Sequence, residues 1–206
     1  MAPLFTIRPL AWEAPDPAGF DAILLTSANA ARHAGPELAR FAALPCWTVG
    51  EATAAAARDA GFAEVRTGPG DGAALAEAVA AAGVRHALHL HGREHVPLAH
   101  PGLRIEERAV YATDAATELP EAARALHSAV ALIHSPRAGA LLAALAPERR
   151  HIALAAISPA AAAVAGAGWE QVAVAAAPRD EALLELAVKL CHNVRPDAGA
   201  GGADGV

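Results

Sequence analysis

Short apolar segments alternate with alanine-rich stretches along most of the chain, and Gly, Pro, Ser or Asp residues bound most of the apolar segments. This alternation is typical of parallel strands that are connected by crossover helices. It predicts an α/β protein with strands at Leu4–Arg8, Asp21–Thr26, Cys46–Val49, Glu64–Thr67, Ala87–Leu90, Ile105–Ala112, Val130–His134, Ile152–Ile157 and Gln171–Val174. Helices are expected in most of the gaps between these strands.

The strand and helix pattern occurs twice, which indicates two similar lobes. Ser27 corresponds to Ser135, and Gly50 corresponds to Ser158, both at an offset of 108 residues. Each of these residues follows a predicted strand and precedes a predicted helix. Because helix N-termini favour anions and ligands of open α/β sheets bind at the carboxyl ends of strands, we expect an anionic ligand between the lobes.

Two extended segments, at residues 4–10 and 107–114, do not fit inside either repeated lobe. The simplest arrangement is that the chain leaves one lobe on the first segment and returns on the second, and that the two segments pair. Such a two-stranded hinge would allow the lobes to open and close around a ligand.

Composition narrows the class of partner and the compartment. The chain has 206 residues, of which 54% are hydrophobic, so each lobe can bury a core. The net charge is −6 and there is no basic block, which argues against a nucleic-acid surface. The start of the chain shows no secretory signal, and two cysteines are too few for a disulfide framework. We therefore expect a cytoplasmic protein with free thiols at Cys46 and Cys191.

Two further segments need an explanation. Residues 152–169 carry no charge, but they are rich in alanine and contain Ser158-Pro159, so we expect a strand followed by a helix and no membrane span. Residues 196–206 are rich in Gly and Ala without an apolar period, and they are expected to form a disordered tail.

The predicted strand ends carry the candidate binding residues. Ser27, Ser135 and Ser158 stand where a hydroxyl can cap the next helix, and capping alone would explain any one of them. Several such groups facing one cleft would also accommodate a ligand that is rich in carboxylates. Further candidates at strand ends are Gly50, Thr53, His91, Gly92, Arg93 and Arg137, with the two arginines either carboxylate clamps or ordinary surface residues.

Histidines gather near the fifth predicted strand, at positions 86, 89, 91, 95 and 100. His89 and His91 would share one face of that strand. A metal site normally needs three or four convergent ligands, with carboxylate or thiolate company, and no second motif in the sequence supplies them. We therefore expect neither a metal nor a cofactor. The serine-hydrolase elbow, the dinucleotide fingerprint and the phosphate loop are also absent from the sequence.

Tyr111 is the only tyrosine in the chain, and it lies on the second hinge segment. It is either a packing residue or a phenol that points into the cleft. A phenol with a pKa near 10 donates a hydrogen bond well at neutral pH.

Taken in order and spacing, these residues resemble the uroporphyrinogen-III synthase family over nearly the whole chain. The similar segments are Leu25–Ser27, Val49–Ala54, Val110–Thr113, Ile133–Pro136, and Ala156–Pro159 followed by Ala167–Trp169. The resemblance implies two flavodoxin-like lobes with parallel sheets, joined by a two-stranded β-ladder hinge. Residues 1–9 and 113–195 would form the lobe of the terminal segments, and residues 10–112 would form the central lobe.

The resemblance also implies the chemistry. The substrate would be hydroxymethylbilane, which loses its terminal hydroxyl as water and closes to uroporphyrinogen III with ring D inverted, without a cofactor. Tyr111 matches the family tyrosine that is proposed to assist departure of the hydroxyl. Ser27, Thr53, Ser135 and Ser158, with neighbouring amides, would hold substrate carboxylates in a monomeric enzyme that binds no nucleic acid and no membrane.

The sequence departs from the family pattern at two places. Ala160 and Ala161 replace a threonine pair, so only backbone N–H groups remain there. Family members also begin with a strand and a helix ahead of the segment that matches residues 2–8, so we expect a weakened terminal lobe.

The alternative function is a non-catalytic, two-lobed binder of an acidic small molecule, which would not need Tyr111. A phosphate-receiving signalling domain is disfavoured, because the strand ends carry Ser or Gly where it needs aspartates.

Overall fold

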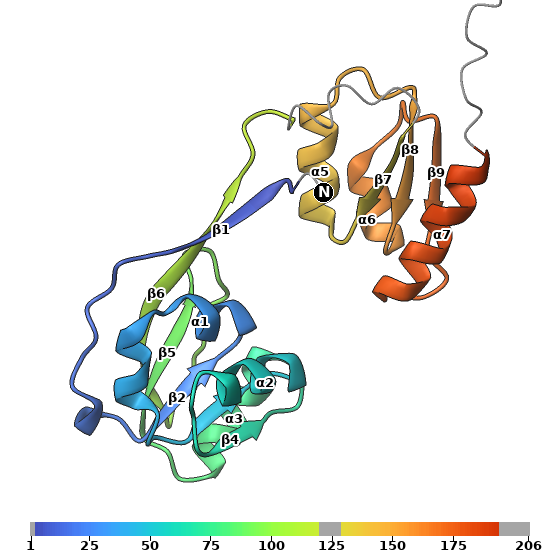
Figure 1. Cartoon of the computed structure of the whole chain (residues 1–206). Coiled ribbons are helices and arrows are strands. Elements are labelled where there is room, and N and C mark those ends of the chain that lie inside the picture. Colours follow the sequence, from blue (N-terminus) through green and yellow to red (C-terminus); the bar gives the residue numbers. More distant parts are fainter. Residues whose placement is uncertain (1–2, 120–128, 194–206) are drawn as a thin grey trace, which may run out of the picture. The chain divides into compact units, whose positions relative to one another are not determined.

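The computed structural model describes residues 3–119 and 129–193. The chain forms two compact units: Thr6–Asp114 make the larger unit, and Met1–Phe5 together with Ala115–Val206 make the smaller one. Figure 1 shows both units as helices packed on sheets. The predicted lobe limits, at residues 9/10 and 112/113, remain a prediction. The predicted tail at residues 196–206 lies outside the described residues.

The larger unit is built on a six-stranded sheet whose strand order is β1-β6-β5-β2-β3-β4. Strands β2 to β6 run parallel to one another. Their order is that of a doubly wound sheet, in which the chain moves outward first on one side of β2 and then on the other. The strands are β1 (Phe5–Pro9), β2 (Ala22–Leu25), β3 (Cys46–Thr48), β4 (Val65–Thr67), β5 (His86–Gly92) and β6 (Arg104–Ala115).

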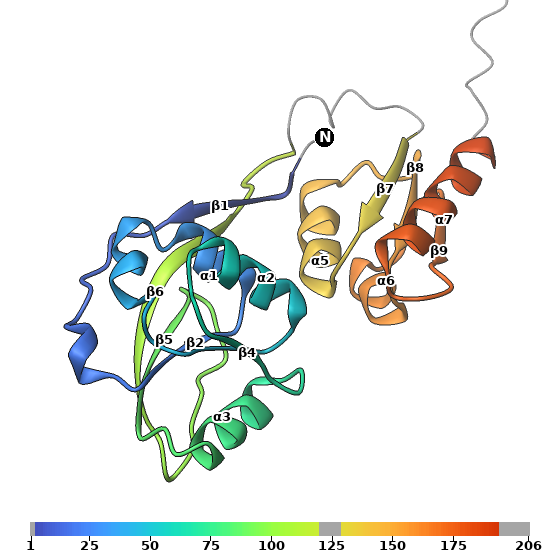
Figure 2. The same cartoon turned by 60° about the horizontal axis from the view of Figure 1, so that its bottom comes forward.

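Helices cover both faces of this sheet. One core includes buried residues of β2, β5, α1 (Ala28–His33), α2 (Glu51–Asp59) and the 3-10 helix η2 (Pro36–Phe41). The core on the other face is made with α3 (Gly72–Ala81), and Figure 2 shows α3 apart from α1 and α2. A short 3-10 helix, η1 (Pro17–Gly19), precedes β2. Every residue of β2 is buried, as expected for a central strand that has helices on both faces.

An aspartate fixes the start of the central strand. The Asp21 carboxylate accepts hydrogen bonds from the backbone N–H groups of Arg85 and His86, each at 2.9 Å. These two bonds lower the pKa of Asp21, so the carboxylate stays ionised and holds the beginning of β5 beside the beginning of β2.

The smaller unit contains a three-stranded parallel sheet in the order β7-β8-β9. Its strands are β7 (Ala129–Ile133), β8 (Ile152–Ala156) and β9 (Gln171–Val174). Helices α5 (Pro136–Leu145) and α6 (Pro159–Ala165) share one core with the sheet, and α7 (Asp180–Asn193) shares another. The uncharged run at residues 152–169 is thus a strand followed by a helix with proline in its first turn, as predicted.

The internal repeat is confirmed at the level of strand order. The parallel run β7-β8-β9 repeats the run β2-β3-β4, and each strand lies at the place that the sequence offset predicts. The two copies differ in burial. All of β2 is buried between β3 and β5, whereas four of the five residues in β7 are only partly buried. Among the described strands, β7 pairs with β8 alone.

The predicted pairing of the two hinge segments is present. β1 lies beside β6 in the sheet, and both strands cross the division between the units along the chain. The backbone N–H of Leu10 donates to the Val110 carbonyl oxygen at 2.9 Å, and Arg8 forms an ion pair with Asp114.

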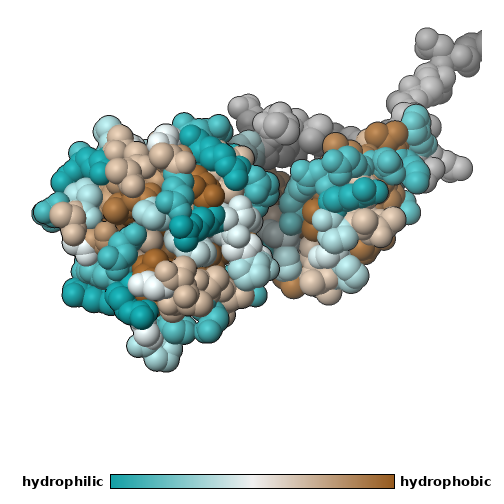
Figure 3. Space-filling view, turned by 90° about the horizontal axis from the view of Figure 1, so that it is seen from below, coloured by the Kyte–Doolittle hydropathy of each residue, from teal (hydrophilic) through white to brown (hydrophobic). Residues whose placement is uncertain are grey.

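Hydrophilic and hydrophobic residues are interspersed over the face drawn in Figure 3. None of the described helices combines the length and apolar character that a membrane crossing requires. Cys46 and Cys191 are both free, and burial raises the pKa of the Cys46 thiol to about 12.

We predict that amide hydrogens of β7 exchange faster than those of β8 in the same unit. β8 is paired on both sides and β7 on one side among the described strands, and one hydrogen bond contributes about 1 kcal/mol. Exchange measured residue by residue by NMR tests this directly. Equal protection of the two strands would contradict the view that β7 pairs on one side only among residues 3–119 and 129–193.

Candidate functional site

The carboxyl ends of the parallel strands bring the predicted residues of the larger unit to one edge of its sheet. Ser27 follows β2, Gly50 follows β3, and Gly92 ends β5. Since β2 lies between β3 and β5, these positions are neighbours along the edge. The boundary between β2 and β5 is also where the strand order reverses, which is the usual ligand position in a doubly wound sheet.

The three predicted serines cap helices. The hydroxyl oxygen of Ser27 accepts from the backbone N–H of Asn29 at 3.2 Å. Ser135 and Ser158 accept in the same way from the residues three positions ahead, at 3.1 and 3.3 Å. Each hydroxyl uses a lone pair for this bond and keeps its own hydrogen. That hydrogen can be donated to a carboxylate while the cap stays intact.

Helix α2 lacks such a side-chain cap. Its N-cap residue is Gly50, and a Cβ built there would meet no atom within 4 Å. No side chain caps the first turn, and the space beside Gly50 is open, so the N–H groups that lack an intrahelical acceptor can bind an anion there. Thr53 is only 6% exposed, so its hydroxyl is largely shielded from a ligand.

Tyr111 lies directly against the end of β5. It pairs in register with Gly92, after a register shift that follows His91. A Cβ on residue 92 would lie 2.6 Å from Cζ and 2.8 Å from the hydroxyl oxygen of Tyr111, so the ring occupies space that only glycine leaves free. The tyrosine is half-buried against the core on the α1 face, and its ring centroid is 6.4 Å from that of His33.

Both candidate arginines have exposed side chains. The backbone N–H of Arg93 donates to the Tyr111 carbonyl oxygen at 2.8 Å, which places this residue just beyond the tyrosine. The Arg137 guanidinium lies 4.9 Å from the ring centroid of Phe5 in the smaller unit. Both side chains thus lie at the surface near a strand end.

The predicted site residues fall into two sets, one in each unit. Ser27, Gly50, Thr53, His91, Gly92, Arg93 and Tyr111 belong to the larger unit, and Ser135, Arg137 and Ser158 belong to the smaller one. Within the smaller unit, Ser135 and Ser158 follow the adjacent parallel strands β7 and β8. Each set therefore occupies the carboxyl edge of its own sheet.

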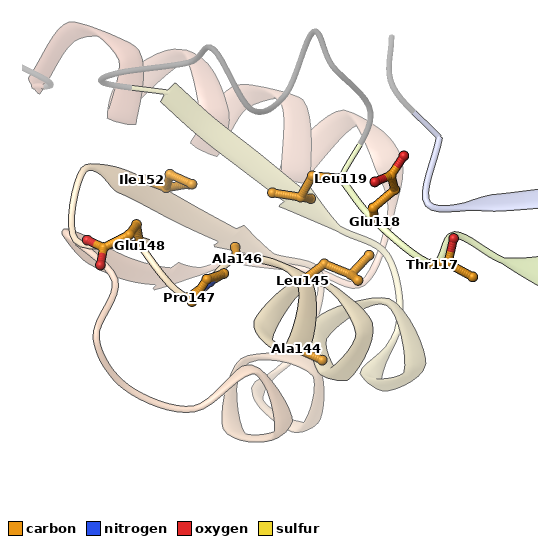
Figure 4. Close-up of a pocket in the computed structure, with 9 residues that line it drawn as sticks. All are labelled: Thr117, Glu118, Leu119, Ala144, Leu145, Ala146, Pro147, Glu148 and Ile152. Atoms are coloured by element: carbon orange, nitrogen blue, oxygen red, sulfur yellow. The ribbon is translucent and has the colours of Figure 1, made fainter.

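A pocket in the smaller unit lies away from this edge. It is lined by residues at the end of α5 and by Ile152, which begins β8, whereas Ser158 follows the other end of that strand (Figure 4). Its wall is largely aliphatic, with Glu118 and Glu148 as the acidic residues that line it. Two carboxylates do not suit a polyanionic ligand, so this pocket is a poor candidate for the substrate site.

Histidines of β5 form a cluster at the same strand end as Gly92. His89 and His91 are 0% and 5% exposed, and His95 comes from the segment that follows β5. The rings of His91 and His95 stack with centroids 3.5 Å apart. Glu107 of β6 joins them, because β5 and β6 pair in a register that sets His89 opposite Glu107. One ligand atom from each of these four residues lies within 4.8 Å of the other three.

The ionisation states in this cluster follow from burial. Burial lowers the pKa of His89 to about 4, with a further effect from His91, and burial also lowers the pKa of His91. Burial alone would raise the pKa of Glu107, but the neighbouring His89 and His95 outweigh it and leave the pKa lowered. At neutral pH the cluster thus contains two neutral buried imidazoles and one carboxylate.

Sequence reasoning missed two members of this arrangement. The first is Glu107, the carboxylate that the histidine pattern in the sequence lacked. The second is Thr26, whose hydroxyl oxygen lies 3.0 Å from Nε2 of His89. The signal for Glu107 was its place on the strand predicted to follow the histidine strand. Thr26 was visible as the last residue of a predicted strand, but only the pairing of β2 with β5 brings it to His89.

Comparison with known proteins gives a match to one protein family. Residues 1–185 match the family model described as uroporphyrinogen-III synthase HemD. No curated protein matches the chain. The crystal structure of uroporphyrinogen-III synthetase from Helicobacter pylori 26695 is similar, with a TM-score of 0.70 and 20% sequence identity over 91% of this chain and 91% of that chain. A mutant uroporphyrinogen III synthase from the extremely thermophilic bacterium Thermus thermophilus gives a TM-score of 0.46 and 16% identity, over 93% of this chain and 88% of that chain.

We predict that Gly92→Ala destabilises the larger unit by about 1–3 kcal/mol, because the new methyl group overlaps the Tyr111 ring. Gly19→Ala is the matched control, since a Cβ at Gly19 would meet nothing within 4 Å and its φ is not in the left-handed region. Urea unfolding of both variants checks this. Equal stability of the two variants would mean that the ring moves aside at little cost.

Proposed function

The chain belongs to the uroporphyrinogen-III synthase family, and on this premise we propose that it cyclises hydroxymethylbilane to uroporphyrinogen III. The family consists of cyclising lyases that act in heme and tetrapyrrole biosynthesis. The main support for this reaction is the position of Tyr111, which lies at the same sheet edge as Ser27, Gly50 and Gly92. This edge combines one phenol with several N–H and hydroxyl donors.

The reaction separates into a departure and a ring closure. The terminal hydroxyl of hydroxymethylbilane leaves as water when the adjacent pyrrole nitrogen pushes electrons toward it and a donor supplies a proton. The electrophilic methylene that remains is attacked by the substituted carbon of ring D. The resulting spiro intermediate fragments, and the released methylene bonds to the unsubstituted α-carbon of ring D, so that ring D is inverted. The proton balance closes when this carbon loses its hydrogen, which restores the proton that the donor gave to the departing hydroxyl.

We assign Tyr111 to the departing hydroxyl. A phenol keeps its proton at neutral pH and donates a strong hydrogen bond. Gly92 leaves the space that holds the ring, and the strand pairing of β5 with β6 fixes the backbone of both residues. The donor is therefore positioned before the substrate arrives, which lowers the cost of reaching the transition state.

The substrate carboxylates would be held mainly by neutral donors. The first-turn amides of α2 beside Gly50, and the hydroxyl hydrogens of Ser27, Ser135 and Ser158, are the groups that best fit this role. Arg93 and Arg137 would add charge at the surface. Thr53, which is nearly buried, contributes less directly. At α6, Ala160 and Ala161 leave backbone N–H groups and the Ser158 hydroxyl as the donors.

One phenol at the departing hydroxyl and many donors at the carboxylates suit this reaction. The pyrrole nitrogen already drives departure of the hydroxyl, and the linear substrate also closes unaided to the wrong isomer. The protein must therefore fold the substrate so that ring D attacks through its substituted carbon, and many positioning contacts serve this purpose better than one strong acid. We also propose that the enzyme works as a cytoplasmic monomer without a nucleotide or a metal in the chemical step.

We predict that the purified chain produces the type III isomer from hydroxymethylbilane that is generated in situ by the preceding enzyme. The products are oxidised to porphyrins and separated by isomer, with a reaction lacking the chain as the reference for spontaneous type I formation. Only type I product from well-folded protein would reject the enzyme and favour a non-catalytic binder.

We predict that Tyr111→Phe lowers turnover more than it raises KM, because the lost hydrogen bond strengthens as the hydroxyl departs. General-acid assistance is typically worth about 100- to 10,000-fold, and we expect the low end or less because the pyrrole assists. His33→Gln is the matched control, since it alters the ring neighbour of Tyr111 and keeps the phenol. Unchanged turnover with a raised KM in Tyr111→Phe would make Tyr111 a positioning residue.

A further inference from the structure

The cluster of His89, His91, His95 and Glu107 is not needed for the reaction proposed above, and its geometry calls for a separate explanation. Three imidazoles and one carboxylate converge from β5, β6 and the segment between them. Two of the residues are buried, and two are partly buried. Burying several polar side chains together costs folding free energy unless their polar atoms have hydrogen-bond partners.

The cluster leaves buried nitrogen atoms unsatisfied. Among the described residues, Nε2 of His91 and Nε2 of His95 are buried and have no hydrogen-bond partner. Nε2 of His95 lies 3.3 Å from a Glu107 carboxylate oxygen, which is within ion-pair reach but without hydrogen-bond geometry. A buried polar atom without a partner costs about 1–3 kcal/mol, so two of them in one cluster point to a missing binding partner.

Hydrogen bonds outside the cluster determine which ring nitrogen of His91 and of His89 is left to face it. Nδ1 of His91 lies 2.8 Å from the Gly92 carbonyl oxygen, which can only accept, so Nδ1 carries the hydrogen and Nε2 presents its lone pair. Nε2 of His89 lies 3.0 Å from the Thr26 hydroxyl, leaving Nδ1 to face Glu107 at 3.4 Å. Metal-binding histidines characteristically use one ring nitrogen for the ion and the other for such a partner.

We propose that His89, His91, His95 and Glu107 form a binding site for one divalent transition-metal ion of the type that prefers imidazole, with Zn²⁺ as the representative ion. Four ligands of this composition suit a tetrahedral zinc ion. Ligand atoms of such an ion are about 3.3 Å apart. The separations from the Glu107 oxygen to Nδ1 of His89 and to Nε2 of His95 are 3.4 and 3.3 Å.

The ion would act as a clamp within the larger unit. His95 lies in the irregular segment between β5 and β6, while the other three ligands lie on those strands. Binding would fix this segment to the sheet and would satisfy both unpartnered nitrogens. When His89 binds through Nδ1, its hydrogen moves to Nε2, and the Thr26 hydroxyl turns from donor to acceptor. All four side chains fill the coordination sphere, so the site holds the ion without an open position for substrate.

The test uses the full chain with any affinity tag removed and metal stripped by a chelator. Titration with ZnCl₂ by calorimetry, and metal analysis after dialysis, should give one Zn²⁺ per chain. Thermal unfolding should shift upward by roughly 5–10 °C at saturating Zn²⁺. Co²⁺ bound at the same site should show the intense visible absorption of four-coordinate cobalt.

Variants connect this binding to the cluster. His95→Gln and Glu107→Gln should each weaken Zn²⁺ binding by about 100-fold or more, and Thr26→Val should weaken it by about 10-fold. His100→Gln is the matched control, because His100 pairs with Glu77 at 3.0 Å outside the cluster and should bind Zn²⁺ normally. Circular dichroism identifies any variant that fails to fold, and His95, on an irregular segment, is the ligand whose replacement is least disruptive.

The proposal is overturned if the folded chain binds no Zn²⁺ saturably, or if His95→Gln and Glu107→Gln bind it as tightly as the original chain. Loss of binding in His100→Gln alone would place the ion elsewhere and would also overturn it. These outcomes are independent of the cyclisation activity, since binding and thermal stability are measured without substrate.

Discussion

The pairing of β5 with β6 is the constraint on which both candidate sites depend. Its register sets His89 opposite Glu107, and the shift after His91 sets Gly92 opposite Tyr111. Successive residues of a strand point to opposite faces. One strand pair can therefore hold a histidine–carboxylate cluster on one face and a phenol against the core on the other. A slip of one residue would separate both pairs at once.

The architecture was largely predictable from the sequence, because local patterns determine strands and caps. The alternation of apolar segments predicted, near their observed positions, all nine strands in the part of the chain that the structure describes, and the repeat predicted that β7, β8 and β9 would correspond to β2, β3 and β4. Ser27, Ser135 and Ser158 were recognisable as helix caps from their neighbours alone. These features depend on residues that are close together in the chain.

The sites were less predictable, because they depend on register and on contacts between distant residues. Glu107 looked like an ordinary strand residue until its pairing with His89 was known. Gly92 was chosen as a strand-end residue, but its close approach to the Tyr111 ring could not be read from spacing. In the smaller unit, the capping serines were evident from the sequence. The lower burial of β7 relative to β2 was not, because it depends on which strands and helices pack beside it.

The contrast between the two cysteines has a practical consequence for chemical labelling. Cys46 is fully buried in a central strand and its pKa is raised to about 12, so it carries almost no thiolate at neutral pH. Cys191 is exposed on α7. A maleimide reagent should therefore modify the native protein at one position without any cysteine being replaced. A single fluorophore or spin label placed in this way would report on α7, while uptake of a second label would report the unfolding of the larger unit.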